Sequence, residues 1–119
     1  MVRTIISLFI VMVFTKWSKF LWHTIHFMTL QHEFDHHQNI ATDETYKTIT
    51  YFLQRLHNLM NCNQCKNKYM NYLAFNPPEL YNGSLFEWTI ELHNHVNATL
   101  NREEWDIDQA RMYYVSFWI

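Results

Sequence analysis

The apolar side chains of this sequence recur at the spacing of helices and not at the two-residue period of strands. In one stretch they fall mostly at steps of three and four residues: Tyr46, Ile49, Phe52, Leu53, Leu56 and Leu59. In a second stretch they fall every fourth residue: Trp88, Leu92, Val96 and Leu100. Because an α-helix has 3.6 residues per turn, side chains at these steps share one face. Both stretches are therefore predicted to be amphipathic helices.

Capping and helix-breaking residues predict where the other helices begin and end. Residues 4–31 are expected to form one long helix or two abutting helices, and the mostly polar residues 32–43 a loop. A third helix is expected from Cys62 to about Phe75, because Asn76-Pro77-Pro78 cannot continue it. The predicted N-caps are Thr42 or Asp43, Asn61, Ser84, and Asp106 or Asp108, which opens a short final helix. The pattern thus predicts a small bundle of four or five helices with short connections.

Composition narrows the class of protein. A chain of 119 residues allows one domain. It contains one glycine and two prolines, whereas sandwiches and barrels use many such residues in tight turns. This scarcity favours an all-α fold. The net charge is −2 with histidine neutral, so no overall basic field predicts a nucleic-acid partner.

The first fifteen residues differ from the rest of the chain. Arg3 precedes an apolar run over residues 5–14 that only Ser7 interrupts. Such a run is too short to span a bilayer as a helix. It suits an extension of the first helix, a signal segment or a peripheral membrane anchor formed by residues 4–15. We therefore expect an apolar segment at 1–15 and one functional domain at 16–119.

Residues 32–36, HEFDH, match the H-E-x-x-H string of zinc metalloproteases. In that string a helix places both histidines on one face as zinc ligands, and the glutamate acts as general base. Here the string lies in the stretch expected to be a loop, and no third ligand stands out. A second possible zinc site joins Cys62 and Cys65 to His32 and either His36 or His37, whose spacings fit. Our interpretation of the string itself is a solvated polar loop.

Cys62 and Cys65 form a C-x-x-C pair near a predicted helix start. The free N–H groups and the dipole of a helix N-terminus stabilise a thiolate. Lys66 and Lys68 add positive charge nearby, and the spacing allows a reversible disulfide. With no further cysteine in the chain, the electrons of this dithiol must pass to another protein or to a bound cofactor.

Two helical faces carry side chains suited to a planar cofactor. Trp22 and His26 are four residues apart and share a face, as do His93 and Asn97. Trp and His offer flat rings for stacking, and Asn offers a donor and an acceptor to the edge of a heterocycle. For Trp22 the alternative explanation is ordinary packing in the core. This explanation is weaker for His93 and Asn97, because burying both side chains requires hydrogen-bond partners.

These residues together resemble the Erv/ALR family of FAD-linked sulfhydryl oxidases. The resemblance rests on Trp17-x₄-Trp22-x₃-His26, Cys62-x-x-Cys65 and His93-Asn94-His95-Val96-Asn97-x-x-Leu100, and covers about residues 16–115. The small size and single cysteine pair look most like the minimal forms encoded by large DNA viruses. The family resemblance implies a four-helix bundle with a short fifth helix that holds FAD noncovalently at the bundle mouth.

The resemblance also implies roles for individual residues. Cys65 would be the sulfur next to the flavin, and Cys62 the one that exchanges with substrate. The implied FAD contacts are Trp22 and His26 on the adenine side, His93, Asn97 and Leu100 along the cofactor, Lys19 and Arg102 at the pyrophosphate, and Trp105 at an aromatic position. No metal ligand is implied.

The implied reaction is oxidation of thiols in a protein substrate or a thioredoxin-like carrier, with O₂ as electron acceptor and H₂O₂ as product. A homodimer is implied, as is an intracellular location in the cytoplasm of a virus-infected cell or in a virion. The secretory pathway or a membrane is the alternative location. The sequence departs from the family at Ser18, where a glycine is usual, in lacking a second C-x-x-C, and in the length of residues 31–43.

Two other functions remain open at this point. One is a helical interaction module stabilised by zinc through Cys62, Cys65 and histidines. The other is a dithiol carrier without a cofactor.

Overall fold

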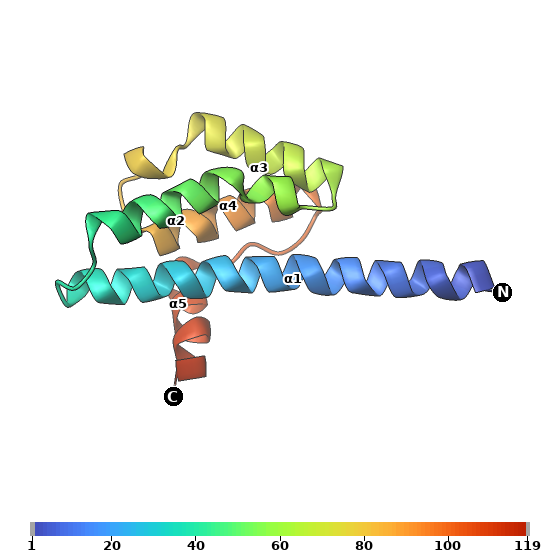
Figure 1. Cartoon of the computed structure of the whole chain (residues 1–119), viewed down its shortest axis with the longest axis horizontal. Coiled ribbons are helices and arrows are strands. Elements are labelled where there is room, and N and C mark those ends of the chain that lie inside the picture. Colours follow the sequence, from blue (N-terminus) through green and yellow to red (C-terminus); the bar gives the residue numbers. More distant parts are fainter. Residues whose placement is uncertain (1, 119) are drawn as a thin grey trace.

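The computed structural model consists of helices joined by short connections (Figure 1). It describes the backbone of residues 2–118 and the side chains of residues 16–117. The α-helices are α1 (Val2–His37), α2 (Asp43–Arg55), α3 (Asn63–Phe75), α4 (Leu85–Thr99) and α5 (Ile107–Val115). Three short 3₁₀ helices follow α2, precede α4 and end the described chain: η1 (Leu56–Leu59), η2 (Pro78–Leu80) and η3 (Ser116–Trp118).

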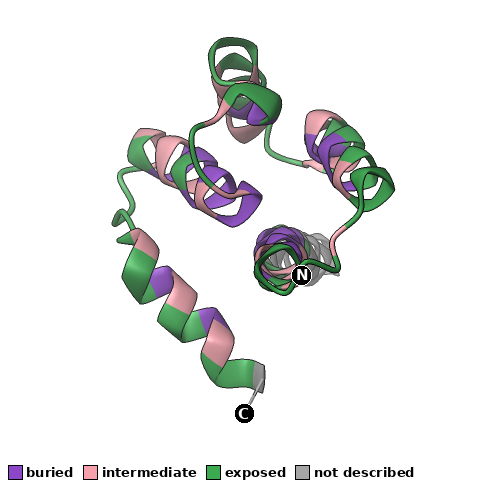
Figure 2. Ribbon diagram, turned by 90° about the vertical axis from the view of Figure 1, so that its left-hand side faces the viewer, coloured by how far each residue is buried: buried purple, intermediate pink, exposed green. Residues whose placement is uncertain are grey.

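Helices α1 to α4 form a four-helix bundle, and α5 lies outside it. Figure 2 looks along α1 and shows the buried residues of the four helices facing a common interior. Helix α5 crosses the direction of α1 and packs against α1 and α4 (Figure 1). The predicted all-α bundle with a short fifth helix is confirmed.

The helix starts are fixed by side-chain caps. Thr42 accepts a hydrogen bond from the Thr45 N–H at 3.1 Å, and Ser84 accepts one from the Glu87 N–H at 3.1 Å. Asp106 caps α5 in the same way through the Gln109 N–H. Each cap satisfies a backbone donor that the first turn of a helix leaves unpaired, a contribution of about 1 kcal/mol. The expected caps at Thr42, Ser84 and Asp106 are therefore confirmed.

The loop expected over residues 32–43 is wrong for its first half. Helix α1 continues through HEFDHH to His37, and the connection to α2 is only residues 38–42. The helix ends because Asn39 adopts the left-handed conformation with φ 59°. The Ile40 N–H then donates to the Asp35 carbonyl at 2.9 Å and the Asn39 N–H to the His36 carbonyl at 3.1 Å. This is a Schellman motif, which asparagine can terminate; polar character alone did not break the helix.

Two apolar clusters hold the elements together. The larger one lies between α1, α2, η1, α3 and α4 and contains Leu21, Trp22, Ile25, Ile49, Leu53, Leu56, Tyr69, Leu85, Trp88, Leu92 and Val96. The smaller one joins α5 to α1 and α4 through Leu30, Phe86, Ile90, Ala110 and Tyr114. Trp88 is fully buried, and its indole N–H donates to the Asn76 carbonyl at 2.8 Å. The predicted stripe of Trp88, Leu92 and Val96 thus faces the core.

The N-terminal segment is helical from Val2 as part of α1, whose first turns project beyond the other helices in Figure 1. The side chains of residues 1–15 lie outside the described part of the structure, so their expected role as extension or anchor stays a prediction. Among the described residues, no helix combines the length and apolar character needed to cross a membrane.

Candidate active site

Cys62 and Cys65 form a disulfide at the N-terminus of α3. Cys62 is the N-cap of the helix, one residue later than the predicted cap Asn61, and its Sγ accepts a hydrogen bond from the Cys65 N–H at 3.2 Å. Cys62 is exposed, whereas Cys65 is half-buried and packs against the larger apolar cluster. The two sulfurs are therefore inequivalent, one facing solvent and one facing the bundle.

Helix α1 is tied to the chain that leads into this disulfide. The Trp17 indole N–H donates to the Leu59 carbonyl at 3.0 Å, three residues before Cys62. Trp17 also stacks on Phe20, one turn further along α1, with ring centroids 5.9 Å apart. These contacts place the middle of α1 beside the cysteine end of the bundle.

A cluster of aromatic and imidazole rings joins α1 to α4. The Trp22 ring lies flat on His93, with centroids 3.9 Å apart and planes 3° from parallel. His26 lies one turn after Trp22, is fully buried, and its Nε2 is 2.9 Å from His93 Nδ1. On its other side His26 Nδ1 is 3.0 Å from the Thr89 hydroxyl. The fold thus brings three of the predicted cofactor residues into direct contact.

The hydrogen-bond network assigns the protons of these rings. The Thr89 hydroxyl donates to the Phe86 carbonyl at 2.7 Å, so its oxygen accepts from His26 Nδ1–H. His26 Nε2 then carries a lone pair and accepts from His93 Nδ1–H. His93 Nε2 remains as an acceptor with no partner among the described residues.

Both histidines are held neutral. Burial, followed by the nearby His93 and His23, holds the pKa of His26 well below its ordinary value of 6.5. Burial, followed by His23 and Arg102, lowers the pKa of His93 to about 3. The cause is desolvation, which disfavours a buried imidazolium. The cluster therefore carries no charge of its own at neutral pH.

Asn97 and Leu100 continue the site along α4. Asn97 is 7% exposed, yet its side chain makes no hydrogen bond to any described residue. Leu100 is half-buried and packs on the larger apolar cluster at the end of α4. An amide without a partner in the protein leaves its donor and its acceptor available to the edge of a bound heterocycle.

The three remaining predicted residues lie at the rim. Lys19 is exposed on α1. The pKa of His23 is lowered mainly by burial and secondly by the charge of Lys19. Arg102 is exposed and follows a second Schellman motif, in which Asn101 has φ 57° and the Arg102 N–H donates to the Asn97 carbonyl at 2.9 Å. Both cations therefore lie near the histidine cluster, and neither makes an ion pair with a described residue.

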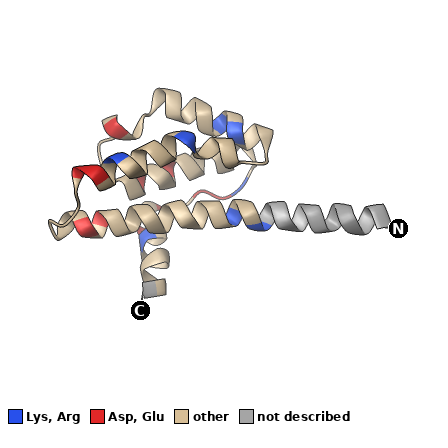
Figure 3. Cartoon of the chain, in the orientation of Figure 1, with Lys and Arg blue, Asp and Glu red and all other residues tan. Residues whose placement is uncertain are grey.

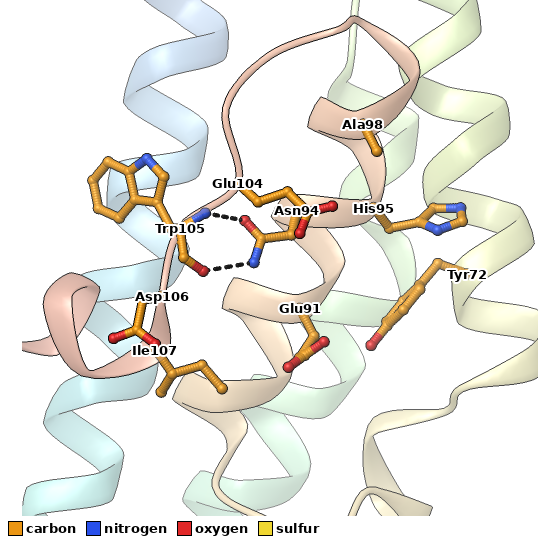
Figure 4. Close-up of a pocket in the computed structure, with 9 residues that line it drawn as sticks. All are labelled: Tyr72, Glu91, Asn94, His95, Ala98, Glu104, Trp105, Asp106 and Ile107. Atoms are coloured by element: carbon orange, nitrogen blue, oxygen red, sulfur yellow. Dashed lines mark hydrogen bonds between the residues drawn. The ribbon is translucent and has the colours of Figure 1, made fainter.

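Trp105 is held through both its backbone and its ring. The Asn94 side chain donates to the Trp105 carbonyl and accepts from the Trp105 N–H, both at 2.8 Å (Figure 4). The indole points away from the groove drawn in Figure 4 and packs near Tyr114, at 6.1 Å between centroids. That groove, of about 490 Å³, lies on the outer face of α4 and is acidic, with Glu91, Glu104 and Asp106 in its wall.

Sequence reasoning missed the residues that support the cluster. Thr89 orients His26, Tyr114 of α5 places its hydroxyl 2.9 Å from His23 Nδ1, and Tyr69 packs against Trp22 at 6.4 Å. Burial raises the pKa of Tyr69 and Tyr114 above the ordinary value of 10. His23 had a signal, because it lies four residues after Lys19 and three before His26; Thr89 and Tyr114 had none, because their roles depend on how helices pack.

The H-E-x-x-H string is helical, so His32 and His36 do share a face, with ring centroids 6.4 Å apart. Glu33, however, is already engaged. Arg111 binds its carboxylate through two hydrogen bonds of 3.0 Å, and the Ser84 hydroxyl donates a third at 2.7 Å. Burial alone would raise the pKa of Glu33, but these donors lower it overall. Glu33 is thus a structural carboxylate that joins α1 to α4 and α5, and no group of three potential metal ligands occurs among the described residues.

The chemistry of the cluster fits a flavin dinucleotide. It offers a flat indole, a free imidazole acceptor at His93, and the unpartnered Asn97 amide for a planar heterocycle. Lys19 and Arg102 offer unpaired cations for a pyrophosphate. Because Trp22 and His93 touch face to face, no ring lies between these two side chains in this conformation.

The comparisons with known proteins bear on the same residues. The comparison with curated proteins and the comparison with solved structures gave no significant match. A family model, described as Erv1 / Alr family, matches residues 19–115. This range contains the disulfide, the ring cluster and both rim cations, and it spans most of the chain. The protein therefore belongs to the Erv1/Alr family.

Proposed function

We propose that this chain is an FAD-dependent thiol oxidase that forms disulfide bonds in a protein substrate or a thiol carrier and uses O₂ as electron acceptor, giving H₂O₂. The Erv1/Alr family implies FAD-linked sulfhydryl oxidase activity. The observation that carries the proposal for this chain is the Cys62–Cys65 disulfide, with Cys62 exposed and Cys65 packed against the cluster that contains Trp22.

Exchange with substrate begins at the exposed sulfur. A substrate thiolate attacks Cys62 Sγ, the Cys62–Cys65 bond breaks, and Cys65 leaves as a thiolate at the start of α3. A second substrate thiolate then attacks the substrate sulfur of the mixed disulfide and releases Cys62. The substrate gains a disulfide, and the electron pair stays on the Cys62 and Cys65 dithiol. The Cys65 N–H that donates to Cys62 Sγ stabilises the released Cys62 thiolate.

The residues that would hold the cofactor are those of the ring cluster and its rim. Trp22, His26, His93, Asn97, Leu100 and Trp105 would contact the rings, and Lys19 and Arg102 the pyrophosphate. Bound FAD would supply the acceptor for the electron pair of the dithiol and its transfer to O₂. Since His26 and His93 are neutral, the positive charge offered to the cofactor comes from the rim and not from the ring cluster.

The other expectations of the family resemblance belong to this proposal. They are a homodimer, an intracellular location in an infected cell or virion, with the secretory pathway or a membrane as the alternative, and an accessory role of residues 4–15 in membrane association. A zinc-stabilised module is not favoured, because Cys62 and Cys65 are bonded to each other and zinc binds thiolates.

Colour tests the proposal directly. The purified protein should be yellow, and its flavin absorbance should bleach when dithiothreitol is added without oxygen and recover in air. A colourless protein that takes up no FAD would contradict the proposal. A colourless protein with one equivalent of zinc would instead support the zinc-stabilised module.

A further inference from the structure

The acidic residues of this chain are segregated along the sequence. Residues 1–32 contain no Asp or Glu, and neither do residues 45–78, which include Cys62 and Cys65. All eleven carboxylates lie in the remaining segments, although the whole chain has a net charge of −2. Seven of the nine Lys and Arg residues lie in these two segments, which are therefore basic.

In the folded chain, acidic and basic side chains lie at opposite ends of the bundle. Figure 3 shows the carboxylates of α1, α2 and η2 at the end of the bundle away from the start of α3. The other end carries Lys66 and Lys68 in the first turns of α3, and Lys16 on α1 beside Trp17, which is bonded to Leu59; Figure 3 shows basic segments of α1 and α3 at this end. We call Lys16, Lys66 and Lys68 the basic end. Three further carboxylates, Glu103, Glu104 and Asp106, lie in the connection between α4 and α5.

The basic end lies at the start of α3, where Cys62 is the N-cap. Lys66 is one helical turn after Cys62, and its N–H donates to the Cys62 carbonyl at 2.9 Å. Lys16 precedes Trp17, whose indole is bonded to Leu59 just before the cysteines. None of the three lysines makes an ion pair with a described residue. Their charges are therefore free to act on a partner that approaches Cys62.

We propose that the basic end selects its substrate: the thiols oxidised at Cys62 belong to a polypeptide with Asp or Glu beside its cysteines. Unpaired charges around a reactive group raise the encounter rate of a partner of opposite charge and lower that of a like-charged one. This inference rests on the proposed thiol oxidase function. Its chemistry is the same exchange, in which two substrate thiols become one disulfide and their electron pair passes through the dithiol to FAD and O₂.

The test uses the FAD-loaded full chain and two reduced peptides of equal length, each with two cysteines. One peptide carries Asp and the other Lys at every position flanking a cysteine. The value of kcat/KM is measured by oxygen uptake at low salt and at about 0.5 M salt, where screening is strong. Each value is divided by the peptide's own rate with 2-hydroxyethyl disulfide, which is uncharged, to remove differences in thiol reactivity. Dithiothreitol serves as a neutral thiol.

We expect the acidic peptide to be oxidised about tenfold faster at low salt, and the preference to shrink to less than about twofold at high salt. The double variant Lys66→Glu/Lys68→Glu should favour the basic peptide. The control Lys47→Glu, which changes an exposed lysine of α2, should keep the original preference.

The outcomes separate this inference from the oxidase proposal. If dithiothreitol is oxidised but both peptides react equally at low salt, the selection by charge is wrong and the oxidase stands. A preference that survives high salt or the double variant overturns the inference in the same way. If dithiothreitol is not oxidised by the FAD-loaded protein, the proposed function itself fails. Should the double variant not fold, the salt dependence of the unmodified protein decides.

Discussion

The indole of Trp22 and the imidazole of His93 lie face to face, 3.9 Å apart at their centroids and 3° from parallel, across the contact between α1 and α4. This pair connects the two helices that carry the predicted cofactor residues. It also places Trp22 in the apolar cluster against which Cys65 packs. The chain thereby joins a redox disulfide to a flat aromatic surface through one continuous core.

Replacing Trp22 should affect cofactor binding more than folding. In Trp22→Phe a ring remains in the core, so we expect a stability loss of about 1–2 kcal/mol. The loss of indole area should weaken FAD binding about three- to tenfold. Flavin absorbance of the purified variant and a denaturant titration measure the two effects. Trp17→Phe, outside the cluster, is the matched control, and equal loss of flavin in both variants would contradict the role of Trp22.

The hydroxyl of Thr89 should stabilise the fold by accepting the hydrogen bond of the buried His26. Thr89→Val keeps the shape of the side chain but removes the acceptor of His26 Nδ1–H, which is fully buried. Leaving this donor unpaired should cost about 1–3 kcal/mol. The measurement is the free energy of unfolding in urea. Thr48→Val, which removes an exposed hydroxyl bonded to the Glu44 carbonyl of its own helix, should cost less than about 0.5 kcal/mol; a similar loss in both variants would refute the assignment.

The stability of the fold should fall as the pH decreases below 6.5. His93, with a pKa of about 3, and His26, also lowered, bind a proton in the unfolded state before they do in the folded state. Their contribution is fully present above pH 6.5 and is lost as the pH falls toward the folded pKa, with a slope of about 1.4 kcal/mol per pH unit for each proton.

This pH dependence is best measured by urea unfolding between pH 7 and pH 5. That range lies above 4.5, the ordinary pKa of Glu33, whose lowered pKa makes its own contribution decline only at lower pH. His93→Gln should reduce the slope by up to about 1.4 kcal/mol per pH unit, the value for one proton. Gln38→Ala, at an exposed position without a titratable group, should leave the slope unchanged. A slope that His93→Gln does not alter would show that His93 is not buried in a neutral state.

The two cysteines should differ in reactivity. Cys65→Ser leaves the exposed Cys62 thiol at the helix N-terminus, and Cys62→Ser leaves the half-buried Cys65. We expect iodoacetamide to alkylate Cys62 about tenfold faster than Cys65. Cys65→Ser should also retain FAD but lose thiol-dependent oxygen uptake. Retained turnover in this variant, or faster alkylation of Cys65, would reverse the assigned roles.

Glu33 should support the fold and not the reaction. The Glu33 carboxylate is largely buried and binds Arg111 through two hydrogen bonds. Glu33→Gln weakens this pair, so we expect the free energy of unfolding to fall by about 1–3 kcal/mol. Oxidase activity of the folded variant should stay within about twofold, and a metal chelator should not change the activity of the unmodified protein. Glu44→Gln, at an exposed site, is the stability control. Activity lost in a folded Glu33→Gln protein, or inhibited by the chelator, would give the H-E-x-x-H string a catalytic role.

The helices and their caps were accessible from the sequence because they depend on local physics. The side chains of Thr42, Ser84 and Asp106 satisfy donors three residues away, and the stripe through Trp88, Leu92 and Val96 follows from the helical period. The polarity of residues 32–37 does not predict the end of α1 at His37, because a polar stretch can continue a helix. The signal was Asn39, which can adopt the left-handed conformation that closes a Schellman motif.

By itself the sequence determined the helical bundle, the cysteine pair and the types of residue that a flavin site requires. Only the tertiary structure decided which sulfur is exposed, that Thr89 fixes the protons of His26 and His93, that Arg111 engages Glu33, and that the carboxylate-free segments meet at the cysteine end. The physical reason is distance along the chain. Caps and periodic faces act within about one helical turn, whereas Thr89 lies 63 residues from His26, and Arg111 lies 78 residues from Glu33. Such contacts exist only once the helices have packed.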